Sequence, residues 1–283
     1  MIRYFWEYFF ERKYMEKIHS AAVGVFGGSG FYSFLEIKDE FLMDTPYGAP
    51  SDKVIIGQVE GIDVAFIPRH GKNHSIPPHM INYRANVYAM KMLGVRSIIG
   101  PCAAGSLSAD VKPRDFVICD QFVDRTNCRK DTYYDGPRTT HISMAQPYCS
   151  CLRKILIDTS KELGIKCHDK GTVVVVQGPR FSTKAESRWY AAQGWEVINM
   201  TQYPECYLAR ELEICYANIS LITDYDVGLE DDPNIKPVST EEVVKVFNEN
   251  NERLRKLLFK AIPKITQNKD CLCLNTLEGA RIN

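Results

Sequence analysis

Polar side chains follow several apolar, strand-like runs of this chain, at the point where each run ends. These residues are Ser29 after "VGVFGG", Arg69 and His70 after "VAFIP", Thr201 after "VINM", and Asp224 and Asp226 after "ISLIT". In sheets built from parallel strands, ligands bind beyond the carboxyl ends of the strands. We therefore expect these side chains to converge on one ligand site.

The glycine-rich turn "GGSG" at residues 27–30 predicts an anion site. Glycines allow successive backbone amides to point at one acceptor, and Ser29 adds a hydroxyl donor. The turn is not a dinucleotide fingerprint, because Ser33 stands where a third glycine is needed, and no Walker motif follows. Taken alone, such a turn is more often a simple strand-to-helix connection.

The cationic and hydroxyl groups of this set suit phosphate. Arg69 offers a planar fork for a bidentate contact, and His70 with the hydroxyls of Ser29 and Thr201 can complete a tetrahedral cage. Without these partners, Arg69 would be expected to pair with a surface acid. The sequence therefore predicts a phosphate site at one edge of the sheet.

The two carboxylates of "TDYD" need a different role, because they would repel phosphate. A carboxyl group can accept a hydrogen bond from an exocyclic amine or share a proton with a ring nitrogen. Asp224 and Asp226 therefore suit a purine with a 6-amino group. If the motif stood alone, a turn after a strand would explain both acids.

These groups must be positioned by alternating strands and helices. Short runs rich in β-branched residues predict strands in "AAVGVFG", "SIIGPCA", "FVICD", "TVVVVQG", "EVINM" and "YANISLITD", and "VIIGQVEGIDVAFIP" predicts a hairpin that turns at Glu60 and Gly61. Helices are predicted at residues 79–94, 149–163, 183–193 and 205–214, and from Ser239 onward. This order predicts an α/β fold with a central, mostly parallel or mixed sheet flanked by helices.

The chain is predicted to form one domain. It has 283 residues and no internal repeat, so we expect an N-terminal extension at residues 1–20, a single folded domain at 21–265 and a Cys-x-Cys tail at 266–283. The aromatic-rich extension lacks a signal-peptide pattern, and Met15 is an alternative start.

The charge balance argues against polyanionic partners. There are 35 basic and 35 acidic residues, which gives no basic field to attract nucleic acid or an anionic membrane. No apolar run reaches membrane-spanning length. We expect a cytoplasmic protein that acts on small molecules.

The cysteines and histidines give no sequence motif for a metal. The ten cysteines include no pair of Cys-x-x-Cys motifs, so most are expected to be small buried hydrophobes. Cys271 and Cys273 lie in a polar tail where disulfide chemistry would be accessible. His70 and His74 have a helical metal-ligand spacing, but Gly71 and nearby prolines make this segment a loop.

Several motifs in their order give a family resemblance. The segments "GGSGFY", "PRHGKNH", "INYRAN", "DQFVDRT", "YDGP", "GPRFSTKAES", "INMT" and "TDYD" resemble those of the 5'-methylthioadenosine phosphorylases, within the trimeric nucleoside phosphorylase superfamily, over about residues 20–265. The resemblance implies phosphorolysis of 5'-methylthioadenosine to adenine and 5-methylthioribose 1-phosphate. It also implies inorganic phosphate as co-substrate, no metal or organic cofactor, and a homotrimer or a hexamer made of two trimers.

The resemblance also assigns site residues. It implies phosphate binding by Ser29, Arg69, His70, Cys102, Ala103 and Thr201. It implies a ribose contact by Met200 and a base pocket of Phe181, Asp224 and Asp226, with Ser182 beside it and Asp224 as the catalytic group. It implies 5'-end contacts by Thr240, Val243 and Val244, and by His141 of a neighbouring subunit.

Some features depart from this pattern or leave alternatives open. Many members of the family have a hydroxyl residue where this chain has Cys102, and the loop between Asp226 and the last helix is long and acidic. A broader purine nucleoside phosphorylase, a nucleoside hydrolase and a silent binding protein on the same fold remain alternatives. By analogy with disulfide-bearing archaeal relatives, Cys149 and Cys215 are a candidate pair typical of thermophiles, with reduced cysteines as the alternative.

Overall fold

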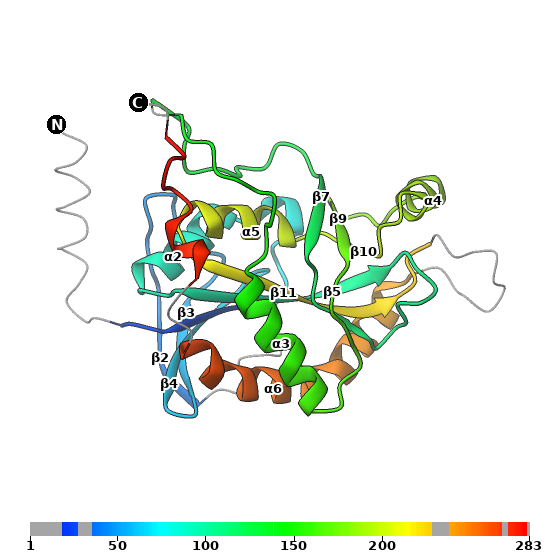
Figure 1. Ribbon diagram of the computed structural model, residues 1–283, viewed down its shortest axis with the longest axis horizontal. Coiled ribbons are helices and arrows are strands. Elements are labelled where there is room, and N and C mark those ends of the chain that lie inside the picture. The colour runs from blue at the N-terminus through cyan, green and yellow to red at the C-terminus, as the bar shows by residue number, and fades with distance from the viewer. Residues whose placement is uncertain (1–18, 28–35, 138, 228–237, 268–270, 282–283) are drawn as a thin grey trace.

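The fold is organised around one mixed sheet, shown by a computed structural model that describes residues 19–27, 36–137, 139–227, 238–267 and 271–281 (Figure 1). Ser29 lies outside the described residues. The strands are β1 Val23–Gly27, β2 Glu36–Phe41, β3 Val54–Val59, β4 Ile62–Pro68, β5 Ser97–Ser106, β6 Phe116–Val117, β7 Gln121–Arg125, β8 Cys167–His168, β9 Thr172–Val176, β10 Val197–Asn199 and β11 Cys215–Asp224. The helices are α2 Tyr83–Met92, α3 Ser150–Glu162, α4 Lys184–Ala192, α5 Gln202–Glu211 and α6 Thr240–Thr266, with 3-10 turns η2 Pro78–Met80 and η3 Leu272–Asn275.

The sheet follows the order β2-β3-β4-β1-β5-β10-β9-β7, and β11 pairs with β5 and β6. Parallel pairing joins β1 to β4 and β5, and β11 to β5. The predicted hairpin is confirmed, since β3 and β4 are antiparallel and Glu60 and Gly61 turn with φ of 51° and 78°. The antiparallel pairing of β10 with β5 makes the sheet mixed, as expected.

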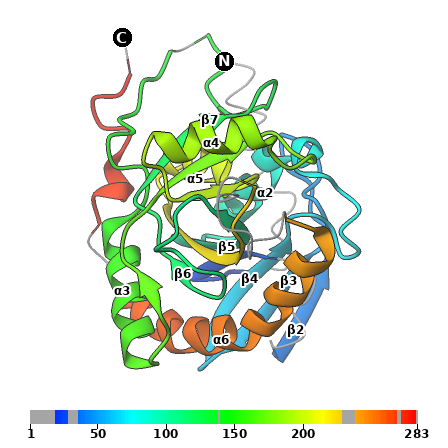
Figure 2. The same ribbon diagram turned by 90° about the vertical axis from the view of Figure 1, so that its right-hand side faces the viewer.

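Helices cover both faces of the sheet. Leu156 of α3 and Leu258 of α6 pack in one of the two large apolar cores with Val25 of β1, and Val87 of α2 and Leu208 of α5 belong to the second. Figures 1 and 2 show α3 and α6 on the opposite side of the sheet from α2 and α5. The two cores fix the central strands, so the strand ends stand on a rigid base.

The helix caps predicted from sequence are present, but one helix starts earlier than expected. Thr183 and Glu186 form the reciprocal capping box of α4, and the Ser239 side chain accepts from the Glu242 backbone at the start of α6. Helix α5 begins at Gln202, not at Glu205 as predicted, and Tyr203 within it is extended (φ −103°, ψ 133°). Because Tyr203 precedes a proline, the helical conformation is disfavoured there, which hid the true start.

One predicted strand is divided, and the tail is more buried than expected. The run "FVICD" contributes only Phe116 and Val117 to β6, and the chain then leads into β7 at Gln121. The prediction of an accessible Cys-x-Cys pair in the tail is wrong for Cys273, which is 7% exposed and packs in the core with α6. No helix within the described ranges is long and apolar enough to cross a membrane.

Candidate active site

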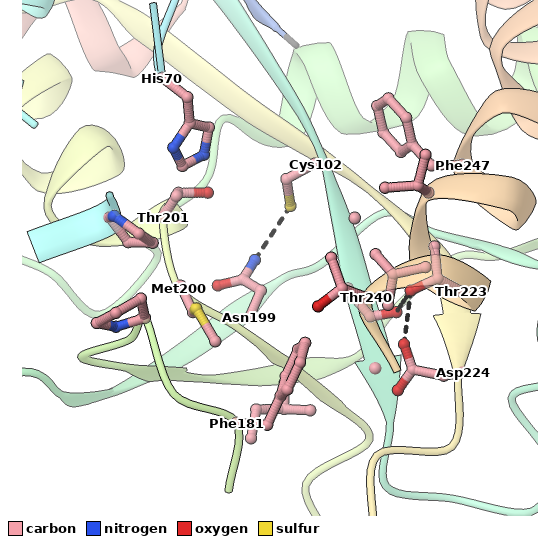
Figure 3. A pocket seen from close by; sticks show the side chains of 18 of the residues that line it. His70, Cys102, Phe181, Asn199, Met200, Thr201, Thr223, Asp224, Thr240 and Phe247 are labelled. Atoms are coloured by element: carbon pink, nitrogen blue, oxygen red, sulfur yellow. Dashed lines mark hydrogen bonds between the residues drawn. The ribbon is translucent and has the colours of Figure 1, made fainter. Parts of the chain in front are cut away.

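A cavity of about 790 Å³ opens beside β5, where β4, β10 and β11 end (Figure 3). This volume fits a metabolite of nucleoside size. Of the residues predicted from sequence, the cavity wall contains Arg69, His70, Cys102, Ala103, Phe181, Ser182, Met200, Thr201, Asp224, Asp226, Thr240, Val243 and Val244. The structure therefore brings these residues together, and their individual roles stay predictions.

Arg69 is fixed by internal partners at one end of the cavity. Its Nε and Nη2 donate to the two carboxylate oxygens of Glu205 at 2.7 and 3.0 Å, and its Nη1 donates to the Pro101 carbonyl at 2.7 Å. Burial alone would lower the pKa of Arg69, but the carboxylate of Glu205 raises it above the ordinary value. Glu205 therefore occupies one edge of the guanidinium, and one N–H group each of Nη1 and Nη2 is left for a ligand, so the bidentate contact to phosphate stays a prediction.

Room for this ion pair comes from a glycine. The Tyr216 hydroxyl donates to Glu205 Oε2 at 2.7 Å. A Cβ on Gly100 would lie 2.1 Å from the Tyr216 hydroxyl oxygen and 3.1 Å from Glu205 Oε2. A side chain at Gly100 would therefore break the group that holds Arg69.

His70 stands beside Arg69 as a neutral ring. Burial lowers the pKa of His70 to about 4, and Arg69 acts in the same direction. Its Nδ1 lies 2.9 Å from the carbonyl oxygen of Ile76, which can only accept, so Nδ1 carries the proton. The Nε2 atom is then an acceptor that suits the hydroxyl of a protonated phosphate.

Thr201 and Cys102 complete this end of the cavity. Thr201 directly precedes α5 and its side chain makes no cap bond, so its buried hydroxyl is available to a ligand. The Cys102 sulfur accepts from the amides of Asn199 at 3.1 Å and Asn218 at 3.3 Å. This arrangement turns the sulfur toward buried donors, and the contact to Asn199 is visible in Figure 3.

Two acids at the end of β11 form the other end of the cavity. Asp224 Oδ2 accepts from the Thr223 hydroxyl at 2.7 Å, and its Oδ1 accepts from the backbone of Asp226 at 2.7 Å. Burial nevertheless raises the pKa of Asp224 to about 6, because it outweighs these two hydrogen bonds. At neutral pH a fraction of Asp224 therefore carries a proton that it can donate.

Asp226 is more deeply buried and lacks part of its hydrogen bonding. It is 3% exposed, and its Oδ2 has no hydrogen-bond partner within the described part of the chain. Burial raises the pKa of Asp226. The Ser187 and Ser182 hydroxyls lie near this carboxylate and lower its pKa, but neither meets Oδ2 with hydrogen-bond geometry, so a ligand that brings an N–H group would satisfy it.

Gly105 of β5 lets these acids approach the sheet. A Cβ at Gly105 would lie 2.9 Å from Ile198 Cγ2 and 3.1 Å from Asp224 Oδ1. The close approach explains why the segment "AAGS" carries a glycine beside the ends of β10 and β11.

Apolar side chains form the wall between the two ends and the cavity mouth. Phe181 and Val244 are 39% and 52% exposed although they line the cavity, so each has apolar surface that a ligand can cover. Figure 3 shows His70 and Thr201 on one side of the cavity and Asp224 on the other, with Phe181 between them near its wall.

His141 is the one predicted and described site residue that does not line this cavity. It is exposed, and its backbone N–H donates to the Ala280 carbonyl at 2.8 Å in the C-terminal tail. His141 therefore lies outside this chain's own cavity, and its contact with substrate in a neighbouring subunit stays a prediction.

Several residues at the site were not predicted from the sequence, among them Asn199, Thr223, Phe247 and Glu205. Asn199, Thr223 and Phe247 line the cavity, and Glu205 holds Arg69 from behind it. Asn199 and Thr223 directly precede predicted site residues, which was an available signal. Glu205 is 136 positions from Arg69, and no local pattern links the two.

Comparison with known proteins agrees with this geometry. A profile of the Phosphorylase superfamily matches residues 22–263. The chain is 52% identical over 256 residues to S-methyl-5'-thioadenosine phosphorylase of Pyrococcus abyssi, covering 90% of this chain and 97% of that protein. It is 48% identical over 269 residues to purine nucleoside phosphorylase of Streptomyces coelicolor, covering 92% and 95%.

Solved structures agree as well. The methylthioadenosine phosphorylase of Schistosoma mansoni in complex with adenine superposes with a TM-score of 0.86 at 33% identity, covering 93% of this chain and 99% of that one. A methylthioadenosine phosphorylase from an antarctic soil metagenomic library gives 0.87 at 37% identity, covering 93% of each chain. By its sequence, fold and cavity, this chain belongs to the phosphorylase superfamily.

Proposed function

We propose that this chain catalyses the phosphorolysis of 5'-methylthioadenosine to adenine and 5-methylthioribose 1-phosphate, with inorganic phosphate as co-substrate. One observation carries the proposal. A single cavity has a buried arginine and a free threonine hydroxyl at one end and two carboxyl groups of raised pKa at the other. These ends suit an anion and a 6-aminopurine, respectively, and residues 21–265 would form the catalytic unit.

The proposed reaction separates charge along the cavity. As the bond between C1' and the purine N9 lengthens, the ribose gains positive charge and the departing base gains negative charge. Phosphate held beside Arg69 and Thr201 stabilises the cation, and one of its oxygens forms the new bond to C1'. Asp224 in its protonated form donates a proton to the purine N7 as the base leaves.

Asp226 supplies base selection in this proposal. Its unpartnered Oδ2 would accept from the 6-amino group, whereas a 6-oxopurine would place an acceptor against it. Phe181 and the first turn of α6, with Thr240 and Val244, would cover the base and the methylthio group. One relative is named purine nucleoside phosphorylase, so phosphorolysis of a broader range of purine nucleosides is the second candidate function.

Product analysis tests the proposal directly. Adenine release from 5'-methylthioadenosine is measured with and without phosphate, and hypoxanthine release is measured with inosine as the substrate. Release that requires phosphate, with inosine inert, is expected. Release without phosphate would indicate a hydrolase, and equal inosine turnover would favour the broader purine phosphorylase.

We further infer that the chain works as a homotrimer or a dimer of trimers, with His141 reaching the 5' end of the substrate in an adjacent subunit. The support is the family resemblance, together with an exposed His141 that lies outside its own cavity.

Complementation between two variants tests this arrangement. His141→Ala and Asp224→Asn chains, each weak alone, are unfolded together and refolded. If sites are shared, mixed trimers contain pockets with both intact residues, and activity should return above that of either variant. No recovery, or a fully active monomer by light scattering, would contradict the shared site.

The Cys149–Cys215 bridge implied by the resemblance stays a prediction. All ten cysteines are free in the structure, and the Cys149 and Cys215 sulfurs lie within 4.8 Å of one another. The sulfurs of Cys271 and Cys273 lie equally near, so the same atoms could also pair differently or share one metal ion.

A further inference from the structure

Four cysteine sulfurs meet at a place in the fold that the cavity does not use. Cys149 is the N-cap of α3, Cys215 is the first residue of β11, and Cys271 and Cys273 lie at the start of η3 in the tail. Their four Sγ atoms all lie within 4.8 Å of one another, and Cys149 Sγ is 3.4 Å from Cys271 Sγ. We call this group the four-sulfur cluster.

The spacing of the four-sulfur cluster suits a tetrahedral metal centre. Zinc bound by four thiolates has Zn–S distances of about 2.3 Å, which places the sulfurs roughly 3.8 Å from each other. A group in which every sulfur is near the other three needs only small shifts to reach that geometry. Two disulfides would instead draw the sulfurs into two close pairs, each at about 2.05 Å.

Donors around the cluster also suit thiolates. The Leu152 backbone N–H donates to Cys149 Sγ at 3.4 Å, and Arg210 Nη1 donates to Cys273 Sγ at 3.9 Å. Arg210 is itself held, because its Nε donates to the Ser143 carbonyl at 2.7 Å. Zinc with four thiolates carries a net charge of two minus, and the Arg210 cation and the Leu152 backbone donor reduce the cost of that charge in a largely buried place.

We propose that Cys149, Cys215, Cys271 and Cys273 bind one zinc ion. On binding, each thiol loses its proton to solvent and forms a Zn–S bond, and nothing is oxidised or reduced. All four positions of the metal are filled by protein, so the site is structural and takes no part in the phosphorolysis. None of the four cysteines lines the cavity.

The zinc would fasten the C-terminal tail to the body of the domain. Beyond the cluster, the Thr276 hydroxyl donates to the Arg210 carbonyl at 2.7 Å and the Leu277 backbone donates to Glu213 at 3.2 Å. The tail then reaches Ala280, whose carbonyl accepts from His141. Metal at the cluster therefore also steadies the segment that carries His141.

The test measures metal, thiol state and stability on the purified full-length protein. We expect about one zinc per chain by elemental analysis, with an intact mass under denaturing, non-reducing conditions equal to that of the fully reduced chain. Cys273→Ser should lower zinc affinity by at least about tenfold. Cys151→Ser, a half-buried cysteine outside the cluster, is the matched control and should keep the metal.

Stability gives a second readout. A strong chelator should lower the unfolding midpoint of the natural chain and of Cys151→Ser but not that of Cys273→Ser. If Cys273→Ser does not fold, zinc titration of the reduced natural chain replaces it, with binding tighter than micromolar expected.

Three results would overturn the zinc site. An intact mass lower by four hydrogens, without metal, would show that the cluster forms two disulfides, and the loss of two hydrogens would point to one bridge such as Cys149–Cys215. Iron in place of zinc would reject the metal assignment. Reduced chains that do not bind added zinc at micromolar concentration would reject the site altogether.

Discussion

The two ends of the cavity treat buried charge in opposite ways. At the phosphate end, Arg69 is 2% exposed, but Glu205 and the Pro101 carbonyl satisfy three of its donors. At the base end, Asp226 is buried and Asp224 is partly buried, neither carboxylate is paired with a cation within the described part of the chain, and burial raises the pKa of both. Arg69 therefore has an opposite charge beside it before a ligand binds, whereas Asp224 and Asp226 do not.

This difference matches what each end is proposed to do. A phosphate ion must be held in one position while its oxygen attacks, so a fixed arginine is useful. A departing purine needs a group whose protonation can change, and a carboxyl group with a pKa of about 6 provides one near neutral pH. Stability is therefore concentrated at one end and reactivity at the other.

The largest expected effect on stability comes from removing the carboxylate that pairs with Arg69. Glu205→Ala leaves the Arg69 cation buried without its partner, which should cost roughly 3–5 kcal/mol of unfolding free energy. Glu249→Ala is the matched control, because Glu249 pairs with Arg114 on the surface at 2.7 Å and should cost under about 1 kcal/mol. Urea unfolding of the two variants measures both free energies. Equal losses of stability would show that the buried pair of Arg69 and Glu205 contributes no more than a surface ion pair.

Asp224→Asn should separate activity from stability at the base end. Loss of the proton donor should lower turnover by about 10²–10⁴-fold. Stability should rise at pH 7, because the asparagine is never charged in this buried place. Asp110→Asn, on the surface, should change neither quantity, and a variant less stable than the natural chain would contradict the argument.

The same residue gives a pH dependence. The pKa of Asp224 rises from 3.8 unfolded to about 6 folded, so the protonated form favours the folded state. Its contribution is present below about pH 4 and is lost as the pH rises through about 6, by roughly 3 kcal/mol in total. Unfolding midpoints of the natural chain and Asp224→Asn should therefore diverge between these pH values.

Asp226→Asn should change base selection with a smaller loss of activity. The asparagine can donate to a 6-oxo group, so the ratio of inosine to 5'-methylthioadenosine turnover should rise by at least about 10²-fold. Both values of kcat/KM measure the ratio. An unchanged ratio would show that Asp226 does not contact the 6-position.

Cys102→Ser should have the smallest effect. A hydroxyl oxygen accepts from Asn199 and Asn218 better than sulfur does and can also donate to phosphate, so the phosphate KM should fall by a few-fold, under about 1 kcal/mol. Initial rates at varied phosphate concentration measure it. A higher KM would show that the sulfur shapes the site instead of merely filling it.

Much of the fold and the membership of the cavity could be predicted from local sequence. Apolar runs predicted the central strands, and the Thr183 capping box marked α4. Of the polar residues that follow strands, all those within the described part of the chain line the cavity. These predictions succeed because strand and cap signals are local, and because strand ends in such a sheet lie near one another.

Other features arose only from tertiary structure. Glu205 binds one edge of the Arg69 guanidinium, Gly105 makes room for Asp224, and two cysteines of the tail lie beside Cys149 and Cys215. Each depends on residues far apart in the chain. The sequence by itself determined which side chains could bind phosphate and a purine. Tertiary structure decided their partners and charge states, because burial and the distance to an opposite charge exist only after the sheet has closed around them.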